Sequence, residues 1–374
     1  MTTFARTDRS ILGRWWWTVD RWTLAAVGLL IAIGMMMSVA ASPAVATRIR
    51  LDSFTLAKHQ FALLPVAIAI LVGVSLLSPR WIRRLSALGF LVFLTLTVLT
   101  LFVGQEIKGA TRWLDLPGFS LQPSEFVKPC FAVVAAWMFS AQHGPERIPG
   151  NLVSIALYLI VVGMLMSQPD LGMTVVVSAT WFAQFFLAGL PLMWVGILML
   201  AGILALLGAY FAFPHVTERV DSFLDPAAGD SYQVDRALDA FRNGGLFGQG
   251  PGEGTVKMTL PDAHADFVFA VVGEELGTIV CLFIVALFAF VLARGIARLL
   301  QEHNLFILLA AAGLLVTFGL QAMINMASTL HLIPTKGMTL PFISYGGSSL
   351  LACALSVGML LALTRRRVGL GEES

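Results

Sequence analysis

Apolar residues in this chain are gathered into long runs separated by short polar connections. A typical run, LAAVGLLIAIGMMM, contains no charged residue. A helix needs about 20 mostly apolar residues to cross a bilayer, and about ten runs of that size occur here. We expect membrane-spanning helices at residues 22–42, 61–78, 85–103, 123–140, 151–167, 171–189, 192–213, 267–293, 305–331 and 342–363.

The composition supports this interpretation. Of 374 residues, 57% are hydrophobic and 12% are charged, and the mean hydropathy is +0.83. A soluble domain carries roughly 25% charged residues, so an ordinary soluble enzyme and a disordered chain are both excluded. Membrane barrels use short alternating strands, which these continuous runs do not resemble. The predicted fold is therefore all-α and polytopic.

The first run is long enough to be a permanent anchor. Its small residues at 40–42 resemble a cleavage site, but the run exceeds the roughly 7 to 15 residues of a signal peptide core. Trp15, Trp16, Trp17 and Trp22 resemble an interfacial belt in front of it. We therefore keep it as a membrane span.

Positive charge predicts the orientation. With the N-terminus inside, the short inner segments hold 13 Lys and Arg residues and the short outer loops hold 6, and such an excess marks the cytoplasmic side. The predicted parts are a cytoplasmic segment 1–21, a transmembrane domain 22–364 and a cytoplasmic tail 365–374. The polar segments that then face outward are 104–122, 331–341 and the long loop 215–265 between the seventh and eighth spans. We expect function on this outer face.

Two charges are drawn into the fourth span. Its purely apolar part, residues 129–139, is too short to cross a bilayer, so the helix must include QPSEFVK, with Pro123 suited to its first position. Glu125 and Lys128 then lie at membrane depth, where charges are costly and face a cavity or a partner. Three residues apart, they share a helix face and can pair. The pair either locks helices together or lines a polar site at the outer leaflet.

The apolar run of the last predicted span is also too short to cross a bilayer. Residues 350–363 are too few to cross alone, so SYGGSS, residues 344–349, must lie at the outer membrane level. Gly346 and Gly347 allow a break or a close backbone approach, which is tolerated there only against protein or a water-filled cavity. Ser344 is a candidate binding residue, but without a Gly-x-Ser-x-Gly elbow a serine nucleophile is not indicated.

The eighth span begins at PDAHADFVFAVVGEELG. Asp266 lies where the outer loop meets the apolar run, and such a carboxylate suits proton abstraction; the alternative is an N-cap that accepts the free amides of the helix start. Glu274 and Glu275 lie about two turns deeper and point roughly 80° and 180° away from Asp266. Glu274 is the better candidate for supporting a site with Asp266, and Glu275 for pairing with another helix.

Two cations lie in the outer loops. Lys336 follows Pro334 in a constrained loop that can hold an ammonium over the site, and Arg112 lies beside Trp113. Fixed cations near a carboxylate, at the level of lipid headgroups, suit a phosphate-bearing amphiphile. Either cation taken alone is also typical of a solvated surface.

Several other kinds of site are not indicated. The six histidines lack a zinc-binding spacing, and the three cysteines lie in apolar runs, as small buried residues do. GQGPGEG at 248–254 lacks a GK[ST] ending and a preceding strand, which favours a flexible loop over a phosphate cradle. The net charge of +2 indicates no bulk attraction to nucleic acid.

Four groups of motifs resemble one known family. They are GATRWLDLPGFSLQPSEFVKP, QPDLGMTVVV, FRNGGLFGQGPGEGTVK with LPDAHADFVFAVVGEELG, and IPTKGMTLPFISYGGSSLL. Together they touch most of residues 104–363 and resemble the SEDS proteins (shape, elongation, division and sporulation). The form PTKG at 334–337 is more similar to the division member of that family than to the elongation member.

The resemblance implies a peptidoglycan glycosyltransferase that polymerises lipid II at the outer face of the cytoplasmic membrane. It implies a place at the division septum, with a class B penicillin-binding protein and other division proteins as partners. Asp266, in the family's P-[ED]-A-H-[TA]-D-F stretch, matches the catalytic aspartate. The expected substrate-binding residues are Arg112, Trp113, Glu125, Lys128, Gln168, Asp170, His264, Glu274, Lys336 and Ser344.

The expected reaction needs a base and positive charge. We expect Asp266 to act as general base on the 4-hydroxyl of the acceptor sugar. Cations, with Lys336, Lys128 and Arg112 as candidates, or a divalent ion (Mg or Mn) would stabilise the leaving pyrophosphate. Ala265 stands where Thr is common in the family, and Asp235 where Gln often precedes the loop helix; neither change removes a catalytic group.

Two other functions remain open at this level. Buried charge and many helices also suit a lipid II flippase or related transporter. A third hypothesis is a scaffold that only assembles division proteins. Polymer formed from lipid II in detergent distinguishes the enzyme from both, because detergent micelles have no two sides to transport between.

Overall fold

The computed structural model describes residues 10–48, 50, 52–107, 110–116, 119–144, 148–212, 216–217, 220–221, 223 and 232–366. Parts of the predicted regions lie outside these residues. They are residues 1–9 of the N-terminal segment, several positions of the long outer loop including His215, and residues 367–374 of the tail.

Each of the ten predicted spans coincides with a helix, which confirms the all-α polytopic fold. Seven of the helices are long and apolar enough to cross a membrane, α7 and α13 are shorter apolar helices, and α5 carries Glu125 and Lys128. The ten are α2 (Arg21–Arg48), α3 (Thr55–Ser75), α4 (Pro79–Val103), α5 (Pro123–Gln142), α6 (Gly150–Ser167), α7 (Leu171–Leu187), α8 (Leu192–Ala212), α11 (Val268–Leu299), α12 (Leu305–Thr329) and α13 (Gly347–Leu363).

Several short elements were not expected from the apolar runs. A short helix, α1 (Ile11–Thr18), precedes α2, and Trp15 within it is buried, with its indole Nε1 donating to Ser75 Oγ of α3 at 2.8 Å. The outer segment 104–122 forms a small antiparallel sheet of β1 (Gln105–Ile107), β2 (Ala110–Leu116) and β3 (Phe119–Leu121), in that order. The sheet leads directly into α5.

The membrane helices pack around two large apolar cores, and a smaller third core joins residues of the outer loop to α2 and α11. One large core joins α2, α3 and α11 to parts of α12 and α13, and the other large core joins α4, α5, α6 and α7 to α12 and α13. Helix α5 contacts α4, α6, α7, α12 and α13, and 15 of its 20 residues are buried. Any charge on α5 therefore meets protein rather than lipid.

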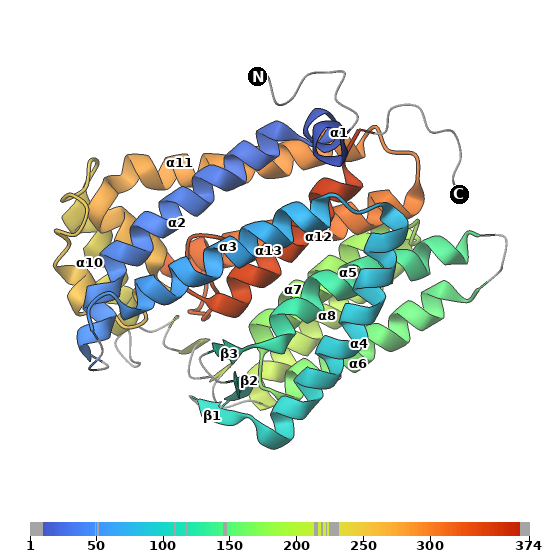
Figure 1. Ribbon diagram of the computed structural model, residues 1–374. Coiled ribbons are helices and arrows are strands. Elements are labelled where there is room, and N and C mark those ends of the chain that lie inside the picture. The colour runs from blue at the N-terminus through green and yellow to red at the C-terminus, as the bar shows by residue number, and fades with distance from the viewer. Residues whose placement is uncertain are drawn as a thin grey trace.

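The two ends of the bundle differ. The N- and C-terminal parts meet at one end, where the backbone N–H of Arg366 donates to Thr18 O at 3.0 Å. Figure 1 shows that the strands and α10 (Tyr232–Gly244) lie away from α1. An even number of spans explains why the termini share one end. We call the end that carries the strands and α10 the outer end, following the predicted orientation.

Candidate active site

A polar stripe on α12 organises the outer end. Gln321, Asn325 and Ser328 are spaced by four and three residues, so they share one face of an otherwise apolar helix. All three bind residues 336–339, which we call the outer strap. Ser328 Oγ accepts from the first N–H of the strap at 2.9 Å, and Asn325 Nδ2 donates to Met338 O at 2.6 Å. Gln321 Nε2 donates to the last carbonyl of the strap at 3.2 Å.

Asp266 lies against this strap. A Cβ built on Gly337 would lie 2.7 Å from Asp266 Oδ2, so the carboxylate rests directly on the glycine backbone. The peptide of Asp266 is held by Asn325 Nδ2, which donates to its carbonyl at 2.9 Å. Helix α11 is capped by Phe267 without a side-chain bond, so the N-cap interpretation of Asp266 is wrong. Asp266 is half-buried.

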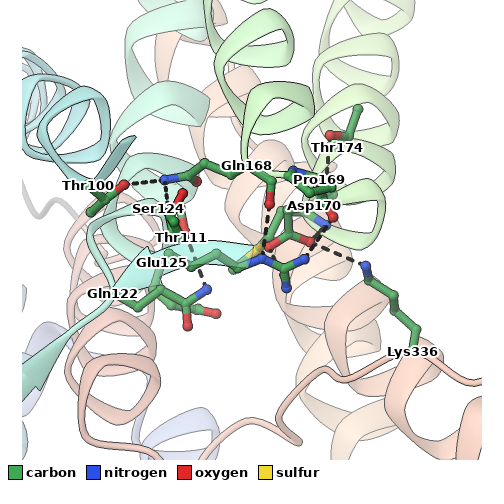
Figure 2. A network of polar contacts seen from close by, with 12 residues as sticks. Thr100, Thr111, Gln122, Ser124, Glu125, Gln168, Pro169, Asp170, Thr174 and Lys336 are labelled. Carbon is green, nitrogen blue, oxygen red and sulfur yellow. Dashed lines mark hydrogen bonds and ion pairs between the residues drawn. The ribbon is translucent and has the colours of Figure 1, made fainter. Parts of the chain in front are cut away.

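Next to Gly337, Lys336 reaches a second cluster at the start of α7. Its Nζ lies 3.4 Å from Asp170 Oδ1, and Arg112 Nη1 lies 3.3 Å from Asp170 Oδ2. Arg112 also donates to the carbonyls of Gln168 at 3.3 Å and Pro169 at 2.7 Å. Figure 2 shows Lys336 and Asp170 facing each other. Two cations share one buried carboxylate, so the cluster carries an excess positive charge.

Gln168 and Trp113 lie beside this cluster, and Gln168 Oε1 is buried without a hydrogen-bond partner among the described residues. Gln168 is fully buried, and its Nε2 donates to the carbonyls of Thr97 and Thr111, both at 3.3 Å, and to the hydroxyl of Thr100. Figure 2 shows the contact of Gln168 with Thr100. Trp113 is half-buried on β2, in register with the neighbouring strand. Gln168 thus ties β2 and α4 to the turn that positions Asp170.

Glu125 and Lys128 form the ion pair that their spacing predicts. Their charged atoms are 2.8 Å apart and both side chains are buried, with exposed fractions of 9% and 3%. Lys128 Nζ also donates to Gln321 Oε1 at 2.9 Å, which ties α5 to α12. A cavity of about 10 Å³ adjoins the pair, which is room for about one water molecule. This geometry is that of an ion pair that holds helices together. It contacts the outer strap through Gln321.

Glu274 does not face Asp266 but holds the outer loop. Its carboxylate is fully buried and accepts from the backbone N–H groups of Thr255, Val256 and Lys257 at 2.8, 2.7 and 2.9 Å. Asn243 Nδ2 adds a fourth bond at 2.8 Å. Both oxygens are therefore occupied, and the prediction that Glu274 supports the site from beside Asp266 needs correction. Its support is indirect, through the loop.

Glu275 pairs with the same loop and not with another helix. It forms a buried ion pair with Lys257 Nζ, and its second oxygen accepts from Gly252 N at 3.1 Å. The prediction was that Glu275 pairs with another helix. Its partner Lys257 lies in the outer loop, where no helical spacing in the sequence indicates which residues will meet. Residues 248–254, expected to form a flexible loop, instead bond to these two adjacent glutamates through the N–H groups of Gln249, Gly250 and Gly252.

Helix α11 is also broken where one continuous span was expected. Gly277 has φ +81° and ψ 174°, a left-handed φ that favours glycine. Residues 245–250 cross the break and take up the released backbone groups. Thr278 N donates to Gly245 O at 3.0 Å, and Gly250 N donates to Glu275 O at 2.9 Å. The segment of α11 before Gly277 is therefore hydrogen-bonded to the outer loop, and Asp266 lies just before this segment.

His264 and Ser344 lie around the peptide before Asp266. Ser344 Oγ donates to Ala265 O at 2.6 Å and accepts from Leu340 N at 2.7 Å, so its hydroxyl is used in the protein. The His264 ring lies 5.1 Å from that of Tyr345, and Tyr345 N donates to His264 O at 2.9 Å. Both residues fix the backbone that carries the aspartate.

The structure thus brings Asp266, Lys336, Arg112 and Asp170 together through the strap and leaves Glu274 elsewhere. Across the described ranges, no group of three or more His, Cys, Asp or Glu side chains is arranged to hold a metal ion. A Mg or Mn ion, the alternative to these cations for stabilising a leaving pyrophosphate, therefore has no cage of three or more such ligands among the described residues. Sequence reasoning missed Gln321, Asn325 and Ser328, although their helical spacing was a readable signal.

Comparisons with known proteins agree with the motifs. The family model of the FtsW, RodA and SpoVE proteins, described as cell cycle protein, matches residues 21–368. The "Probable peptidoglycan glycosyltransferase FtsW" of Caulobacter vibrioides (strain NA1000 / CB15N) is 48% identical over 98% of this chain and 94% of that protein. The protein of the same name from Trichlorobacter lovleyi is 35% identical over 91% and 92%.

Solved structures share the fold. A chain from work on a peptidoglycan synthase complex that coordinates polymerization and crosslinking is 29% identical, with a TM-score of 0.76 over 92% of this chain and 97% of that chain. The crystal structure of the Thermus thermophilus rod shape determining protein RodA is 28% identical, with a TM-score of 0.67 over 93% and 97%. These matches show that the chain belongs to the FtsW, RodA and SpoVE family of cell cycle proteins, the SEDS family that its motifs predicted.

Proposed function

We propose that this chain is a peptidoglycan glycosyltransferase that polymerises lipid II at the outer face of the cytoplasmic membrane during septal wall synthesis. The names of the curated relatives support the enzyme class. The observation that carries the proposal is the contact of Asp266 with Gly337 of the outer strap. Gly337 directly follows Lys336, which belongs to the cationic cluster. A base and a cationic cluster thus meet at the mouth of a membrane bundle.

The site suits a substrate that stays in the bilayer while its sugar reacts. Lipid II carries a disaccharide-pentapeptide on a polyprenyl pyrophosphate. Asp266 takes the proton from the 4-hydroxyl of the acceptor's GlcNAc, and that oxygen attacks the anomeric carbon of the donor. The bond from this carbon to the pyrophosphate breaks, and inversion gives a β-1,4 link. Positioned proton transfer contributes about 10² to 10⁴ in rate.

The leaving pyrophosphate needs positive charge near it. Arg112 and Lys336 share Asp170, and their side chains are 18% and 16% exposed, so both can turn toward a phosphate. Lys128 is buried and committed to Glu125 and Gln321. We therefore assign the pyrophosphate to Arg112 and Lys336 and give Lys128 a structural role. Phosphate contacts of this kind are charge-assisted and strong.

Partners follow from the substrate and from the relatives. The chain is a multi-pass membrane protein, and the structure solved in work on a peptidoglycan synthase complex supports assembly with another wall enzyme. We assign that partner to the class B penicillin-binding proteins, which crosslink the strands formed here. The division septum is the proposed location, in keeping with the FtsW names of the relatives.

The deciding experiment is polymerisation of lipid II in detergent by the purified protein with its partner. Asp266→Asn removes the base and keeps the size, so we expect at least about a 10²-fold loss of rate. Asp235→Asn is the matched control, because it makes the same change on the exposed outer helix α10. Normal polymer from Asp266→Asn would end the proposal. Lipid movement across vesicles without any polymer would favour a transporter instead.

A further inference from the structure

A cavity lies at the inner end of the bundle, far from Asp266. It has a volume of about 270 Å³ and lies where α11 ends, α12 begins and α13 ends. Leu299, Ile307 and Leu363 supply its apolar walls. Leu299 and Leu363 end α11 and α13 and Ile307 lies in the first turn of α12, so the cavity opens at the level of the inner lipid headgroups.

The charged lining of this cavity is predominantly positive. Arg298, Arg365 and Arg366 face one acidic residue, Glu302. The Glu302 carboxylate is already used, because its Oε1 accepts from Asn304 N at 2.9 Å in the turn before α12. The lining therefore carries an excess of two positive charges.

Next to the cavity, one buried carboxylate forms ion pairs with two arginines. Asp20 is 3% exposed and accepts from Arg294 Nε at 2.9 and 2.8 Å, while Arg298 Nε lies 3.6 Å away. Arg294 and Arg366 both lie close enough to Arg298 to repel its charge. Asp20 balances one of these three positive charges, and a second anion would lower the free-energy cost of the remaining like charges at the rim of a low-dielectric bundle.

We propose that this cavity binds the phosphate-bearing headgroup of an anionic phospholipid of the inner leaflet. The arginines provide forked donors for phosphate oxygens, and the apolar walls accept the start of the acyl chains. Basic pockets between the inner ends of membrane helices suit such headgroups. Leu300, 83% exposed beside the cavity, extends the apolar surface toward lipid. The bound lipid joins α11, α12 and α13, independently of the reaction at the outer end.

Short-chain phosphatidylglycerol tests the proposal against phosphatidylcholine, with the full-length protein in neutral detergent. We expect phosphatidylglycerol to raise the melting temperature and to remain bound in native mass spectrometry, whereas phosphatidylcholine does neither. Arg366→Gln and Arg298→Gln should each weaken phosphatidylglycerol binding by about tenfold, because each removes charge-assisted hydrogen bonds. Both variants should fold, since Arg366 is exposed and Asp20 keeps its bonds to Arg294.

Arg84→Gln is the matched control. Arg84 is an exposed arginine near the start of α4, stacked on Trp81 and outside the cavity, so this variant should bind phosphatidylglycerol normally. An equal response to both lipids, or an equal loss in Arg84→Gln, would overturn the site in favour of general surface charge. If inorganic phosphate at the same concentration gives the full rise in melting temperature, the site binds a free ion and the lipid assignment is wrong.

Discussion

The carboxylate of Asp266 lies directly against the backbone of Gly337, although 70 residues separate them in the chain. The contact is tight enough that a Cβ built on Gly337 would lie 2.7 Å from Asp266 Oδ2. The strap therefore sets the position of the proposed base, and it needs a residue without a side chain at this point.

Gly337→Ala should displace the carboxylate of Asp266. A misplacement of about 1 Å can cost roughly 10²-fold in rate, so we expect polymerisation to fall by 10- to 100-fold while the protein stays folded. Gly346→Ala is the control, because its nearest neighbours would lie at an ordinary 3.5 and 3.6 Å. Polymerisation and melting temperature are measured for both. Full activity of Gly337→Ala would show that the strap does not position the base.

Asn325→Ala should loosen Asp266 and the strap together. It leaves the carbonyls of Asp266 and Met338 without the amide donor that binds both, at a cost of about 1 to 3 kcal/mol for each buried carbonyl. We expect a lower melting temperature and a lower kcat. Met323→Ala on the exposed face of the same helix should change neither. A stable Asn325→Ala protein with normal kcat would contradict this role.

Lys336→Met and Arg112→Met should each lower kcat/KM for lipid II. Loss of one positioned charge at a developing anion costs roughly 10² to 10³ in rate. The double variant should lose less than the product of the single losses, because the two cations share Asp170. Lys58→Met is the control, since the Lys58–Asp52 pair is 71% exposed at both ends. Strictly multiplicative losses would argue against a shared pyrophosphate site.

Lys257→Met should strongly destabilise the outer loop. It leaves the fully buried Glu275 without its cation, and an uncompensated buried charge costs about 3 to 5 kcal/mol. Lys257→Met with Glu275→Gln should recover most of this stability, because the neutral amide still accepts from Gly252 N. Thermal unfolding and protease cleavage within residues 250–258 report the effect. Equal stability of the single and double variants would mean that the ion pair does not hold the loop.

Much of the architecture could be predicted because it depends on local pattern. Ten apolar runs became ten helices, and the short apolar run before residue 140 correctly required α5 to include Glu125 and Lys128. The spacing of three residues then predicted their pairing. The helix beginning at residue 268 was expected to be continuous, because the conformation of Gly277 depends on the loop that crosses it.

The apolar runs predict which segments cross the membrane and which polar residues accompany them, because the length and apolarity of each run govern its transfer into the bilayer. The contacts between polar groups, in contrast, depend on the packing of the helices. Asn325 reaches Asp266 and Met338, and Glu274 binds the 255–257 backbone, through contacts between distant segments. Such pairings depend on how the helices pack, and no local period along the chain encodes them.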